Sequence, residues 1–174
     1  MTACGKTSNP YVSHTPVSTS SYAASAFYGD AMGAEVLAFS ITSTSNMPSG
    51  SFTYNGYAGF GNGAISSYSD LALVGNLTLN ANFSNGTYSG SITNFYNSLG
   101  SLSGTANMSG TISGNTLSGN TSGSLSQGGS TVTNSGTMIG AFADNGSSNA
   151  TAVLGTMTGI SGSDSYSGLF VGKR

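Results

Sequence analysis

The sequence predicts an all-β protein, an eight-stranded antiparallel up-and-down β-barrel with an extended N-terminal arm. The first observation is a period of two across residues 136–174, where glycine alternates with large apolar residues. Alternation places successive side chains on opposite faces of a strand, and a small barrel interior is filled by alternating small and large residues. The second observation is a series of short apolar segments separated by turn residues, and the third is the near absence of helical periodicity after residue 45.

The composition fits one folded domain preceded by an arm. Only 5% of the residues are charged, against about 25% in ordinary globular chains. Disordered chains combine low hydrophobicity with high net charge, whereas this chain is 37% hydrophobic with a net charge of −2. We therefore expect a tether over residues 1–21, N-terminal strands that pack on the barrel over 22–49, and the barrel over 50–174.

The arm and the first strands have the weakest pattern. Residues 1–21 contain Pro10, Pro16 and many hydroxyl side chains, which are typical of an extended tether. Residues 26–28 and 36–42 fit two strands or a short helix followed by a strand, and Pro48 lies in the turn that follows. The first barrel strand is then expected over residues 51–60.

The clearest strand follows over residues 71–83. Every second residue is apolar, from Leu71 to Phe83, and polar side chains occupy the other face. We expect the odd positions inside the barrel. Asn85-Gly86 predicts a tight type I′ hairpin turn, because both central residues of that turn need a positive φ. The remaining strands are expected over residues 87–96, 102–112, 116–125, 131–143, 150–160 and 165–171.

Five aromatic residues break the alternation near strand ends: Tyr54, Tyr57, Phe60, Phe95 and Tyr96. Tyrosine and phenylalanine are enriched at binding surfaces, so these residues are candidates for contact with a ligand or partner. They also fit aromatic plugs at the ends of a small barrel. Phe83, Phe142 and Phe170 share the glycine-rich face and are expected in the core.

The charge balance excludes several function classes. The three basic residues, Lys6, Lys173 and Arg174, cannot form a patch that follows a phosphate backbone, so no nucleic-acid partner is expected. The five carboxylates are isolated in the sequence, and a catalytic triad would have to use His14 in the tether. We therefore do not expect an enzyme. A structural zinc site is not expected either, because four suitable ligands for tetrahedral zinc are lacking.

Cys4 is the only cysteine, within Thr2-Ala3-Cys4-Gly5. Small residues before a cysteine are typical of the end of a bacterial lipoprotein signal, in which the cysteine is acylated. The apolar part of a leader is not in the sequence, so Met1 would start a truncated leader. We therefore expect Cys4 to be lipidated and to anchor the protein in a membrane, and Gly5 fits sorting to the outer membrane. Without lipidation the protein would be secreted.

The barrel pattern resembles transferrin-binding protein B and the related solute-binding lipoproteins. Three sets of residues carry the resemblance. They are residues 77–92, then residues 103–106 with 112–119, and then residues 140–143, 152–159 and 168–174, the last of which ends in Gly172-Lys173-Arg174. Phe142-Ala143-Asp144 departs from the family's Phe-Tyr-Gly. The chain is too short to include the handle domains of true transferrin receptors, so a ligand other than transferrin is expected.

The resemblance implies a non-catalytic binding lipoprotein of the bacterial envelope, on the surface or periplasmic side of the outer membrane. Its partner would be a small solute or a protein. No cofactor is expected, although some relatives bind haem, and His14 or an exposed tyrosine could hold the iron. The alternative is an adhesin-like structural protein with a repetitive β-fold, which would require a fixed repeat period that the sequence lacks.

Overall fold

A computed structural model of the chain describes residues 40–62, 65, 70–144 and 149–174, and these form a closed antiparallel barrel of eight strands. The barrel strands are, in order, β2 Ser51–Gly61, β3 Leu73–Asn82, β4 Thr87–Asn97, β5 Gly100–Ser113, β6 Thr116–Gln127, β7 Ser130–Asp144, β8 Ala152–Ser161 and β9 Asp164–Lys173. Each strand pairs with the next along the chain. The pairing of β2 with β9 closes the ring, which confirms the predicted fold class.

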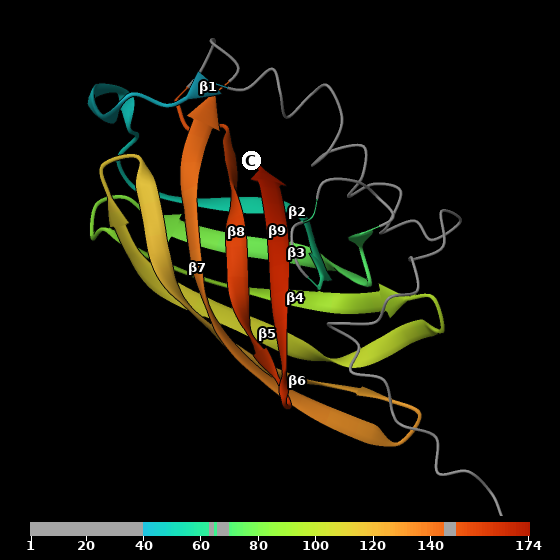
Figure 1. The fold of residues 1–174 in the computed structure, drawn as a ribbon. Coiled ribbons are helices and arrows are strands. Elements are labelled where there is room, and N and C mark those ends of the chain that lie inside the picture. Colours follow the sequence, from blue (N-terminus) through green and yellow to red (C-terminus); the bar gives the residue numbers. More distant parts are fainter. Residues whose placement is uncertain (1–39, 63–64, 66–69, 145–148) are drawn as a thin grey trace, which may run out of the picture.

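The segment before the barrel is attached at one end of β7. Strand β1, Ser40–Ile41, pairs antiparallel with the end of β7 at Ala143 and Asp144. A short 3₁₀ helix, η2, Thr44–Asn46, follows β1. Thr42 is fully buried, its amide donates to Phe142 O, and its hydroxyl accepts from Ala150 N. Figure 1 shows β1 at the tip of β7. The strands proposed for residues 22–39 lie outside the described residues.

The predicted alternation of β3 is confirmed within the strand. Leu73, Leu77, Leu79 and Ala81 belong to the main core, each at most 1% exposed. Leu71 differs, because it precedes β3 and packs with Val74 in a second, smaller cluster.

The predicted type I′ turn at Asn85-Gly86 is wrong. Asn82 pairs with Thr87, so the hairpin loop is four residues long, and of these four residues only Gly86 has a positive φ, at 64°. The Asn82 side chain accepts from Asn85 N, which stabilises the longer loop. The longer loop lets Phe83 leave the strand and pack on Phe142, with 4.8 Å between ring centroids.

Glycines on the inner face make room for large side chains from other strands. A Cβ at Gly119 would lie 2.4 Å from the Tyr88 hydroxyl, and one at Gly136 would lie 2.6 Å from the Tyr166 hydroxyl. Phe170 occupies the corresponding space over Gly140 and Gly155. The alternation of glycine with large residues therefore serves packing, because rings from one strand fill the space left over glycines on strands one or two positions away in the barrel.

Candidate functional site

The five candidate aromatic residues divide between the two faces of the barrel wall. Tyr54, Phe60 and Phe95 lie in the core, at 0%, 1% and 0% exposure, so they cannot form a surface contact patch. Tyr57 and Tyr96 are half-buried and pack against Val74 in the second cluster. The structure thus assigns three of the candidates to packing and leaves two on the outer face.

A β-bulge explains why Phe95 and Tyr96 break the alternation. The pairing of β4 shifts register between Ile92 and Phe95, and Asn94 within the shift has a positive φ of 52°. An inserted residue reverses which positions face inward. Ile92 and Phe95 both reach the core as a result, and Tyr96 is turned outward opposite Val74.

Aromatic rings fill the barrel interior toward both ends of β2. Near its start, Tyr54 and Phe142 lie 5.6 Å apart between centroids. Near its end, Phe60 lies 5.7 Å from Tyr166 and 6.2 Å from Phe95. The space between Phe60, Ile92, Ala106, Thr121, Asn134, Met157 and Tyr166 does not admit a water-sized sphere. This part of the interior is therefore packed by side chains and holds no ligand cavity.

The buried polar groups of the barrel are phenols, hydroxyls and amides. The Tyr54 hydroxyl donates to Ala150 O at 2.6 Å, and the Tyr166 hydroxyl pairs with Thr121 Oγ1 at 3.1 Å. Tyr88 and Asn134 have side-chain polar atoms without a hydrogen-bond partner among the described residues. Burial raises the pKa of both Tyr54 and Tyr88 to about 12, so these phenols are neutral at physiological pH and are poor general bases there.

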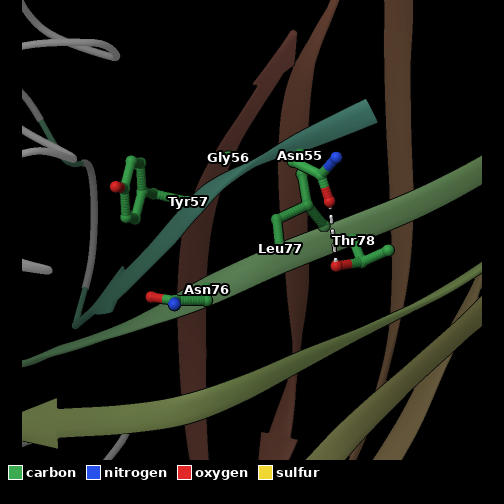
Figure 2. A pocket seen from close by; sticks show the side chains of 6 residues that line it. All are labelled: Asn55, Gly56, Tyr57, Asn76, Leu77 and Thr78. Carbon is green, nitrogen blue, oxygen red and sulfur yellow. Dashed lines mark hydrogen bonds between the residues drawn. The ribbon is translucent and has the colours of Figure 1, made fainter. Parts of the chain in front are cut away.

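On the outer face, β2 and β3 form a polar hollow of about 340 Å³. Its lining residues are Asn55, Gly56, Tyr57, Asn76, Leu77 and Thr78. Tyr57 is paired with Asn76 across the strands, and Asn55 is paired with Thr78. Figure 2 shows Tyr57 and Asn76 projecting from neighbouring strands, with Asn55 and Thr78 joined by a 3.3 Å hydrogen bond further along.

Alternation positions these four side chains. Tyr54 and Ala58 point inward on β2, so Asn55 and Tyr57 point outward, and Leu77 likewise leaves Asn76 and Thr78 outside. Outward neighbours on one strand are separated by about 7 Å, and paired residues have Cβ atoms about 5 Å apart. The hollow therefore offers an aromatic ring, two amides and a hydroxyl within a small area.

Charge is sparse around the hollow. Lys173 on β9 lies opposite Asn55 of β2 in the sheet, and Lys173 also makes an interaction of its own. Arg174 lies over the Phe52 ring at 4.0 Å and donates to Asn149 O. Aromatic faces attract cations, so this contact holds the C-terminal residue against the end of the barrel.

Sequence reasoning found Tyr57 but not its polar neighbours. Asn76 and Thr78 were recognisable as outward residues of an alternating strand, yet this pattern also describes many other amides and hydroxyls on the wall. Their pairing with Tyr57 and Asn55 depends on the register of β2 against β3, which no local signal specifies. Cys4 and His14 lie outside the described residues, so lipidation and iron binding stay predictions.

The residues that the structure describes contain no group of three or more His, Cys, Asp or Glu side chains that could hold a metal ion. Within the same ranges, no helix has the length and hydropathy needed to cross a membrane.

Comparison with known proteins supports the fold. No protein-family model and no curated protein matches the chain. Among solved structures, the chain is similar to a mutant of the vaccine antigen transferrin-binding protein B from Haemophilus parasuis, with a TM-score of 0.53 and 20% sequence identity. The match covers 76% of this chain and 28% of that protein, so the chain spans under a third of its length. At this identity the similarity shows a common barrel fold.

Proposed function

We propose that the protein is a non-catalytic binding module of the bacterial envelope, which uses the outer wall of its barrel to contact its partner. The observation that carries this proposal is the contrast between the two sides of the wall. The interior around Phe60 and Tyr166 is filled by side chains, whereas the outside has a hollow of about 340 Å³ with an aromatic ring and amides. Pockets of this size are typical of binding sites.

The surface of the wall supports a binding role. The charged residues of the described ranges are Asp70, Asp144, Asp164, Lys173 and Arg174, and none lies within β4, β5 or β6. Outward positions there are occupied mainly by Ser, Thr and Asn. These short side chains lose less rotamer freedom than Lys, Glu or Arg when they are immobilised in an interface. Contacts made through them would be stabilised mainly by hydrogen bonds. The strength of such contacts would depend only weakly on salt concentration.

The N-terminal sequence supports attachment to a membrane. Thr2-Ala3-Cys4-Gly5 fits acylation of Cys4, and the Ser- and Thr-rich residues that follow fit a tether between the lipid and the barrel. A barrel held in this way at the outer membrane would present its wall to partners in the envelope or at the cell surface.

The partner is a protein or a small solute. The similar structure from Haemophilus parasuis is named for transferrin binding, which supports the use of this fold for recognition. Haem is the alternative small solute, with His14 or an outward tyrosine as the iron ligand. The filled interior favours a partner that binds outside.

Site-specific photocrosslinking of the lipidated chain in Gram-negative cells tests the proposal. A benzophenone amino acid at position 57 samples the hollow, and one at Ser122, an exposed outward residue of β6, is the matched control. We expect an adduct from position 57 that persists at high salt. Absence of adducts from position 57 and from the neighbouring position 55 would contradict binding at this wall.

A haemin titration of the purified chain separates the two kinds of partner. We expect no shift of the Soret band, because the interior between Phe60 and Tyr166 does not admit even a water-sized sphere. A shift that His14→Ala abolishes would instead support haem as the solute.

A further inference from the structure

We propose that the hollow between β2 and β3 binds a neutral saccharide, with one sugar ring stacked on Tyr57 and its hydroxyls bound by Asn55, Asn76 and Thr78. This inference rests on the proposed function and names the class of ligand for the same wall. It follows from the kinds of side chain in the hollow, from their arrangement in register, and from the scarcity of charge around them.

The aromatic component is Tyr57. It is turned outward between Val171 on β9 and Asn76 on β3, and it packs at the edge of the cluster around Val74. This packing fixes the position of the ring, so little conformational entropy is lost when a ligand covers it. A pyranose ring has one face lined by C–H groups, and such a face is complementary to an aromatic surface with a polar edge.

The polar component is matched to hydroxyl groups. A sugar hydroxyl both donates and accepts, and a primary amide does the same with two donors and one acceptor oxygen. The Asn55 oxygen accepts from the Thr78 hydroxyl, which orients the amide and leaves its NH₂ group for a ligand. Asn76, paired with Tyr57, has a half-buried side chain with no hydrogen bond to described residues.

The surrounding charges favour a neutral ligand. Among the described residues no carboxylate lines the hollow, and Lys173 at its edge has an interaction of its own. Neither a cationic nor an anionic ligand would find a dedicated counter-charge. The hollow is therefore complementary to a ligand whose polarity resides in hydroxyls.

A peptide that adds a strand to the sheet does not fit here. Strand β2 is hydrogen-bonded to β3 on one side and to β9 on the other, so its backbone has no open edge beside the hollow. Recognition must use side chains, whereas strand addition depends on unpaired main-chain groups.

Saturation-transfer NMR on the purified full chain tests this inference, with chitotetraose, cellotetraose and maltotetraose as probes. We expect transfer to the ring C–H protons of at least one probe, retention of binding in Tyr57→Phe, and its loss in Tyr57→Ala. Asn55→Ala should weaken binding at least about fivefold, corresponding to roughly one hydrogen bond. Asn107→Ala, at an exposed outward position on β5, is the matched control and should bind normally.

Circular dichroism of each variant checks folding, and Asn55→Ala provides a second test if Tyr57→Ala does not fold. Absence of transfer to all three probes would overturn the saccharide inference, as would normal binding by the folded Tyr57→Ala variant. Crosslinks from position 57 to a protein, together with no saccharide binding, would refute this inference alone and leave the binding module intact.

Discussion

Tyr54 and Tyr88 both reach the barrel interior, but their hydroxyls differ in hydrogen bonding. The Tyr54 hydroxyl donates to Ala150 O at 2.6 Å, and Ala150 holds a positive φ of 51° beside it. The Tyr88 hydroxyl lies over Gly119 with no partner among the described residues. A buried polar group without a partner has lost its hydration and gains no bond in return.

Removal of each hydroxyl should therefore have a different effect on stability. We expect Tyr54→Phe to lower the free energy of unfolding by about 1 kcal/mol, because a hydrogen bond is lost and a carbonyl is left unpaired. Tyr88→Phe should be neutral or slightly stabilising. Urea unfolding of the two variants beside the wild type measures both changes. Equal losses would show that the Tyr88 hydroxyl has a partner after all.

At the scale of elements, glycines on the inner face make room for large side chains of neighbouring strands. Gly168 on β9 is paired with Phe60 on β2, and a Cβ there would lie 2.7 Å from Phe60 Cδ1. The side chain of the adjacent Ser167 points outward, so it does not face the core. Strand β9 thus tolerates a methyl group on one face and excludes it on the other.

We expect Gly168→Ala to destabilise the barrel by about 1–3 kcal/mol, the usual cost of overpacking a filled core. Ser167→Ala is the control and should change stability by less than about 0.5 kcal/mol. Urea unfolding of Gly168→Ala in a Phe60→Leu background tests the cause, because a smaller side chain should reduce the loss. Additive effects of the two substitutions would contradict direct contact.

The strands could be predicted from the sequence because each has its own alternating pattern and turn residues. The irregular positions could not. Phe95 and Tyr96 depend on a bulge at Asn94, and the loop at Asn85 depends on where Phe83 finds space beside Phe142. Both are decided by packing between strands, which overrides local turn preferences. The polar part of the hollow has the same origin, since Tyr57 meets Asn76 only through strand register.

For the whole molecule, the filled interior links stability to pH through its phenols. Tyr54, Tyr88 and Tyr166 are each at most 4% exposed, and burial is the main cause that raises the pKa of all three. The positive charge of Arg174 opposes the shift at Tyr54, and the Thr121 hydrogen bond opposes it at Tyr166. For Tyr54 and Tyr88 the result is a pKa of about 12, against an ordinary value of 10.0.

The barrel should therefore lose stability in alkali over a defined range. Above pH 10 the unfolded chain releases phenolic protons that the folded barrel retains, so unfolding becomes progressively easier. This stabilisation is complete below pH 10 and is lost as the pH rises through about 12. Urea midpoints measured across this range should fall steadily, and phenolate absorbance should show a late-titrating group of tyrosines that merges with the rest once urea unfolds the chain. A urea midpoint that stays constant up to pH 12 would mean that these phenols ionise without disturbing the core, and that the interior is open to water.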